Sequence, residues 1–132
     1  MDNYLSMSLF AGGVYNTLLV IFHILFWKLE MFNWKEELKK MSAVNSSIMQ
    51  MFNVACIISI TTMAYLNFFH AQELLTTSLG RSVLGCFSIF WLIRLVEQFI
   101  WGAHGFKNNC IVAACILPGL VFYIIPLIGT YK

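Results

Sequence analysis

The sequence predicts an all-α membrane protein, a bundle of four transmembrane helices joined by short loops. Hydrophobic residues make up 60% of the 132 residues and charged residues only 11%, whereas a soluble domain carries about 25% charged residues. Four apolar runs, about 6–27, 43–69, 79–101 and 109–130, are each long enough to cross a hydrocarbon core of about 30 Å. The chain, 1–132, is therefore predicted to be a single four-helix membrane domain.

The first run and the segment after it differ sharply in charge. No Lys or Arg precedes the first run, which is therefore expected to be a retained span and not a secretory signal. Segment 28–40 alternates charged residues with apolar ones such as Trp34, as is typical of an amphipathic turn or short helix at the membrane surface. Ser42 is expected to cap the second span. Within that span Gln50 and Asn53 share a helical face that is expected to meet other helices.

The third and fourth runs contain residues that are unusual in a membrane span. Arg94 and Glu97 interrupt the third run, while Pro118 and Pro126 are expected to bend the fourth. The cysteines lie in apolar stretches without a Cys-x-x-Cys pair, so zinc and thioredoxin-like chemistry are not indicated, and burial is expected. They are Cys56, Cys86, Cys110 and Cys115.

Lys and Arg residues are unevenly divided between the two predicted ends of the bundle. Loops 28–42 and 102–108 hold five of them, whereas the opposite side holds Arg81 and Lys132. By the positive-inside rule these two loops are predicted to be cytoplasmic, with both termini outside. Because the basic residues lie in separate loops and form no dense stripe, a nucleic-acid partner is not expected.

Polar and ionisable residues at membrane depth form the candidate site. A charge at the bilayer centre costs about 2.5–3.5 kcal/mol on insertion scales. Arg94 and Glu97, three positions apart on one helical face, are expected to neutralise each other. The other polar residues are expected at a similar depth near the cytoplasmic end, and no catalytic or metal-ligating role is assigned. The predicted cluster comprises His23, Gln50, Asn53, Arg94, Glu97, Gln98 and His104.

This cluster has two competing interpretations. It lines a cavity that binds a small solute or relays protons, or its ion pair and amide groups fasten the helices together. A haem site would require two histidines facing each other at matched depth, which only His23 and His104 could supply. Since His104 is flanked by Gly102 and Gly105 in an expected loop, haem is the least favoured alternative, and no cofactor is predicted.

Several short motifs resemble those of a group of small bacterial membrane proteins with four predicted spans. The resemblance implies a bacterial inner membrane, extends over most of the chain, and makes His23, Arg81, Arg94 and Gln98 the first positions to test. The group has no assigned activity, so the resemblance implies no functional role for any residue. The motifs are Phe22-His23, Asn33-Trp34-Lys35-Glu36-Glu37-Leu38, and Arg81 followed by Phe90-Trp91-x-x-Arg94-Leu95-x-x-Gln98.

The predicted function is that of an accessory or scaffold subunit in a membrane assembly, because short loops leave no room for a soluble catalytic domain. The alternative is a transporter or channel-like oligomer that uses a polar cavity around Arg94 and Glu97. A membrane enzyme is disfavoured because no serine, cysteine or carboxylate pair has the spacing of a nucleophile or metal site. The expected partners are membrane lipids and other membrane subunits or further copies of the chain.

Overall fold

The computed structural model describes residues 3–102 and 105–131, and over these residues all the regular secondary structure is helical. Four helices are long and apolar enough to cross a membrane, which confirms the all-α class and the number of candidate spans. The long helices are α1 (Asn3–Leu25), α3 (Ala43–Phe69), α5 (Ser78–Trp101) and α6 (Gly105–Gly129). The connecting elements are η1 (Phe26–Lys28), η2 (Glu30–Phe32), α2 (Trp34–Lys40) and α4 (Ala71–Thr76).

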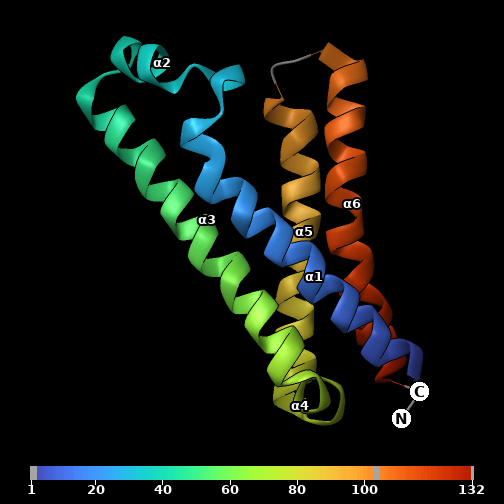
Figure 1. Cartoon of the computed structure of the whole chain (residues 1–132). Helices are drawn as coiled ribbons and strands as arrows, with labels where there is room; N and C mark the ends of the chain where they lie inside the picture. Colours follow the sequence, from blue (N-terminus) through green and yellow to red (C-terminus); the bar gives the residue numbers. More distant parts are fainter. Residues whose placement is uncertain (1–2, 103–104, 132) are drawn as a thin grey trace.

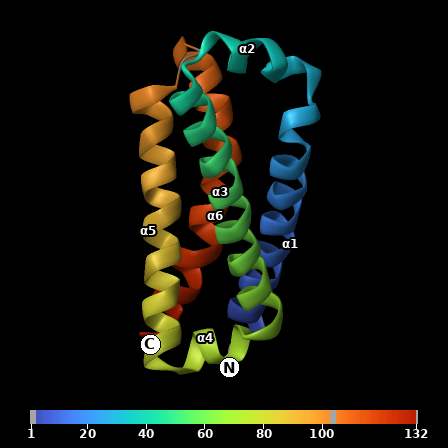
Figure 2. The same cartoon turned by 90° about the vertical axis from the view of Figure 1, so that its left-hand side faces the viewer.

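The long helices form two pairs that meet at one end of the molecule and diverge at the other (Figure 1). α1 packs against both α3 and α6, and α5 packs against α6. Helix α4 lies at the end where the pairs meet, together with the start of α1 and the end of α6 (Figures 1 and 2). We call this the α4 end, and the opposite end, which carries α2 and the start of α6, the α2 end. α3 and α5 therefore separate toward the α2 end.

Side chains at the helix starts explain where two of the long helices begin. The Ser42 hydroxyl accepts a hydrogen bond from the Asn45 backbone N–H at 3.2 Å, as predicted for the cap of α3. The Thr77 hydroxyl accepts one from the Gly80 N–H at 2.8 Å at the start of α5. Asn33 has a left-handed backbone with φ of 44°, a conformation that asparagine adopts more readily than most residues. It turns the chain from η2 into α2.

Glycines allow the long helices to approach closely. A Cβ at Gly12 of α1 would lie 2.9 Å from Asn67 Nδ2 of α3 and 3.1 Å from Phe122 Cβ of α6. A Cβ at Gly119 of α6 would lie 2.5 Å from the ring of Trp91 on α5. Small residues are the usual means of close contact between membrane helices. These two glycines therefore set the distance at two helix interfaces.

Hydroxyl groups of α1 bond to carbonyl groups of α6 near its two prolines. Pro126 has no N–H to bond the carbonyl of Phe122 four residues earlier, and Ser8 Oγ donates to that carbonyl at 3.2 Å. Near the other proline, Tyr15 Oη donates to the Cys115 carbonyl at 2.8 Å. Since hydrocarbon offers no partner to a free carbonyl, these bonds stabilise the packing of α1 on α6.

The expectation that the cysteines are buried inside the chain is wrong. Cys56 is half-buried, and the side chains of Cys86, Cys110 and Cys115 are exposed on the outer faces of their helices. A residue in an apolar run is compatible with lipid as well as with a protein interior, because lipid tails are as apolar as leucine. The apolar surroundings of these positions therefore did not indicate which way they face.

Candidate functional site

The predicted polar cluster divides into separate groups in the structure. Gln50 stands apart from them, since it is exposed and its Nε2 donates only to the Ser46 carbonyl of its own helix at 3.3 Å. His104 lies outside the described residues. The groups are His23 with Asn53, Arg94 with Glu97, and Gln98 with Asn109.

His23 and Asn53 fasten α1 to α3 through a reciprocal pair of hydrogen bonds. Asn53 Nδ2 donates to the His23 carbonyl at 3.2 Å, and Asn53 Oδ1 lies 2.8 Å from His23 Nδ1. Because the amide nitrogen is used on the carbonyl, the amide oxygen accepts from the imidazole, so Nδ1 carries the hydrogen. Of the two amides expected to join helices, Asn53 bonds to a neighbouring helix and Gln50 bonds within its own.

Replacing Asn53 by leucine should reveal this fastening. We expect Asn53→Leu to lower the free energy of unfolding by about 1 kcal/mol, because the His23 N–H loses its acceptor inside the membrane domain. Gln50→Leu is the matched control and should have little effect, since Gln50 bonds only within α3. Unfolding by SDS in mixed micelles, followed by tryptophan fluorescence, measures both variants. Equal losses at the two positions would contradict a specific role for Asn53.

Gln98 and Asn109 join the end of α5 to the start of α6. Gln98 Nε2 donates to Asn109 Oδ1 at 3.2 Å, and Asn109 Nδ2 donates to the Gly102 carbonyl at 3.1 Å. Both amide side chains are buried. A Cβ at Gly102 would lie 2.4 Å from Asn109 Oδ1, so the amide packs directly on the chain where α5 ends. These contacts are satisfied within the chain and account for both residues structurally.

Arg94 and Glu97 form an ion pair on the side of α5 that lies toward α3. Arg94 Nη1 and Glu97 Oε2 are 3.6 Å apart, and the two side chains are 46% and 37% exposed. Cys56 of α3 lies within electrostatic range of both charges, so the pair borders the opening between α3 and α5. Arg94 lies seven positions before Trp101, the last residue of α5, or about 10 Å along the helix axis.

This ion pair leaves most of its hydrogen-bonding capacity unused within the described residues. A guanidinium has five N–H donors and a carboxylate has several acceptor sites, yet one 3.6 Å contact is what joins them here. A polar group without a partner in hydrocarbon costs several kcal/mol. Water, lipid headgroups or another protein must therefore surround Arg94 and Glu97 in the membrane.

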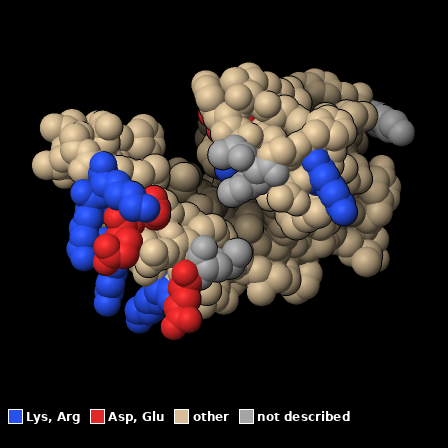
Figure 3. Space-filling view, turned by 90° about the horizontal axis from the view of Figure 1, so that it is seen from above, with Lys and Arg blue, Asp and Glu red and all other residues tan. Residues whose placement is uncertain are grey.

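The surface of the molecule is hollowed at the α2 end. Figure 3 looks onto that end and shows the surface hollowed between the part that carries most of the charged residues and the rest of the molecule. Lys39 and Lys40 pair with Glu36 and Glu37 at 2.8 Å and 2.6 Å. Because these α2 pairs are exposed, each contributes little to stability. They give the rim of the hollow both signs of charge.

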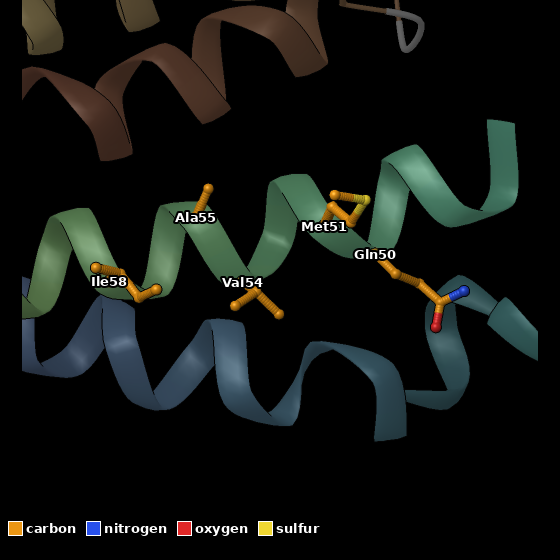
Figure 4. Close-up of a pocket in the computed structure, with 5 residues that line it drawn as sticks. All are labelled: Gln50, Met51, Val54, Ala55 and Ile58. Carbon is orange, nitrogen blue, oxygen red and sulfur yellow. The ribbon is translucent and has the colours of Figure 1, made fainter. Parts of the chain in front are cut away.

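Two grooves of the described surface have mostly apolar linings. A groove of about 440 Å³ follows the surface of α3, and the side chains that line it all come from that helix (Figure 4). Its lining is almost entirely apolar. Another groove of about 370 Å³ lies where α3, α4 and α5 meet, and the paired His70 and Glu73 are part of its lining. Neither groove is lined by any member of the predicted cluster except Gln50.

A polar group that the sequence analysis missed lies at the crossing of three helices. Tyr123 of α6 is fully buried, and its Oη lies 2.5 Å from Asn16 Nδ2 of α1 and 3.0 Å from Asn67 Nδ2 of α3. Both asparagines are also buried. The available signal was the presence of an asparagine in each of two apolar runs, because polar residues in membrane helices face the helix interfaces.

The hydrogen bonds of this group are best satisfied when one amide accepts from the Tyr123 hydroxyl and the other amide donates to it. A tyrosine hydroxyl has one hydrogen to donate, and the Asn16 and Asn67 amide oxygens have no other partner among the described residues. Turning the Asn16 amide would let its oxygen accept the Tyr123 O–H. The 2.5 Å separation suits an O–H···O bond, while the 3.0 Å separation suits an N–H from Asn67. One hydroxyl then links α1, α3 and α6.

Neither the described residues nor comparison with known proteins identifies an activity. Within residues 3–102 and 105–131 there is no group of three or more His, Cys, Asp or Glu that could hold a metal ion. No protein-family model, curated protein or solved structure matches the chain. The resemblance to small bacterial four-span proteins therefore stays a prediction, and the functional argument depends on the geometry of the chain.

Proposed function

We propose that this chain is an accessory or scaffold subunit of a membrane assembly and that Arg94 and Glu97 contact another protein. The observation that carries the proposal is their half-exposed ion pair, about 10 Å from the end of a membrane-spanning helix. Other polar residues of the predicted cluster already have partners within the chain. A protein surface with matching charges would satisfy the pair, as lipid tails cannot.

The proposed setting is a bacterial inner membrane with the α2 end on the cytoplasmic side. All the described lysines belong to α2, the turns before it and the start of α6, whereas Arg81 lies near the start of α5 at the α4 end. The positive-inside rule then favours a cytoplasmic α2 end. Trp27 of η1 and Trp34 of α2 support this position at a membrane surface. Their ring centroids lie 5.0 Å apart, and tryptophan is enriched at headgroup level.

The proposal predicts that the chain associates through these charges. In mild detergent, size-exclusion chromatography with light scattering should give a protein mass above the 15.1 kDa of one chain. The double variant Arg94→Leu/Glu97→Leu should lose this association yet still fold, since replacing both partners by apolar groups leaves no unpaired charge. Glu36→Gln/Lys39→Gln is the control, because it removes an exposed ion pair of the same spacing.

Two outcomes would argue against this function. A wild-type chain that stays monomeric and crosslinks to no protein in its own membrane would contradict it. Proton or solute flux in proteoliposomes that changes in Glu97→Gln would favour the transporter alternative. The subunit is favoured here because the half-exposed ion pair calls for a partner of matching charge.

A further inference from the structure

The ion pair on α5 also indicates which kind of partner binds at Arg94 and Glu97. Resting on the proposed function, we infer that the partner at Arg94 and Glu97 is a second copy of this chain. The two copies lie parallel about a two-fold axis along the membrane normal. Arg94 of each copy contacts Glu97 of the other, so the assembly begins as a homodimer.

Charge complementarity favours a second copy over the other occupants of this surface. The two opposite charges lie 3.6 Å apart on one helix. A lipid phosphate that approached Arg94 would be repelled by Glu97, and a cation that approached Glu97 would be repelled by Arg94. A partner must therefore present an acid and a base at the same depth. A parallel copy of this chain does so by symmetry, because a two-fold axis places residue i against j and j against i.

The side of α5 that carries Glu97 has exposed positions on which another helix can pack. Cys86, Ile93 and Glu97 are spaced by seven and four positions, which places them on one side of the helix, and Cys86 and Ile93 are exposed. Cys86 and Ile93 are therefore not covered by the described part of the same chain.

Pairing between copies would use the donors and acceptors that one copy leaves free. Within one chain Arg94 and Glu97 share a single long contact. Two copies bring together two guanidinium and two carboxylate groups, which can form charge-assisted hydrogen bonds in both directions. Removing one charge of such a set leaves its partner unpaired in a poorly solvated site, which is more costly than removing both.

Charge reversal provides a direct test. Arg94→Glu places two acidic residues at the proposed contact, and Glu97→Arg places two basic residues there. Each variant alone should self-associate at least about tenfold more weakly than the wild type, about 1.4 kcal/mol. An equimolar mixture of the two should form mixed dimers, because the acidic residues of one variant can pair with the basic residues of the other. The swapped variant Arg94→Glu/Glu97→Arg should retain wild-type association. Two differently tagged copies, reconstituted and then captured through one tag, report each combination.

The outcomes separate this inference from the proposed function. Mixed dimers formed from two variants that fail alone show that both fold and that the charges act between copies. Association that is unchanged by charge reversal would overturn the homodimer. So would a wild-type monomer that binds a different protein or an anionic phospholipid through Arg94. Binding of a different protein would leave the proposed subunit function intact, whereas lipid binding without any protein partner would remove both.

Discussion

Gly119→Ala is expected to lower the free energy of unfolding by about 1–3 kcal/mol, the usual cost of overpacking a well-packed contact. The added Cβ would lie between 2.5 and 2.7 Å from three ring atoms of Trp91. That ring is buried and stiff, and it packs against Tyr15 of α1 and Phe90 of α5 with ring centroids 5.5 Å and 5.4 Å away. Relieving the contact must therefore separate α5 from α6 or disturb α1.

Gly85→Ala is the matched control for this prediction. It makes the same chemical change inside a long helix, but its Cβ would meet nothing within 4 Å. Alanine is a better helix former than glycine by about 1 kcal/mol, so the control should be neutral or stabilising. SDS unfolding in mixed micelles, followed by Trp91 and the other tryptophans, compares the two. Similar effects at Gly119 and Gly85 would show that the close contact of α5 with α6 is not what limits stability.

The two ends of the molecule differ in how they are held together. Toward the α4 end, α1, α3 and α6 are joined through Tyr123, and Ser8 adds a bond from α1 to α6. Toward the α2 end the contacts are pairwise, with His23 bonded to Asn53 and Gln98 bonded to Asn109. These bonds hold each helix pair together but do not join α3 to α5. The opening beside the Arg94 ion pair follows from this difference.

The spans could be predicted because a membrane imposes a length and a composition on each helix separately. Run 43–69 was predicted with the same bounds as α3, and its Ser42 cap is a local feature of four residues. The fourth span was placed at 109–130, whereas α6 begins at Gly105. The short segment before Cys110 contains Lys107 and two asparagines. Because these residues are polar, the apolar run did not include the first turn of the helix.

Contacts between helices could not be predicted because they depend on rotation about each helix axis. In a soluble helix a polar face indicates that rotation, but here all faces are largely apolar. His23 and Asn53 were predicted at similar depth, yet their pairing needed the packing of α1 on α3. Gln50 was grouped with Asn53 by spacing alone, and it faces outward. To predict the Tyr123 group, the rotations of α1, α3 and α6 about their axes would all have to be known.

Tyr123→Phe is the second substitution for which we expect a large effect, a loss of about 1–3 kcal/mol of unfolding free energy. The change removes one oxygen and leaves the ring in place against Phe87, whose centroid is 5.1 Å away. The loss arises because the amides of Asn16 and Asn67 remain buried after their common partner is removed. Tyr4→Phe is the control, since the Tyr4 side chain is half exposed.

Replacing Asn16 and Asn67, whose buried amides lose their common partner, should restore stability to the Tyr123→Phe chain. Replacing all hydrogen-bonding partners by apolar groups of similar shape is nearly neutral in protein interiors, whereas leaving one unsatisfied is not. The triple variant Tyr123→Phe/Asn16→Leu/Asn67→Leu should therefore unfold at a higher SDS fraction than Tyr123→Phe alone. If the triple variant is the less stable of the two, then shape rather than hydrogen bonding controls this crossing. The Tyr123 hydroxyl would then not be the group that joins α1, α3 and α6.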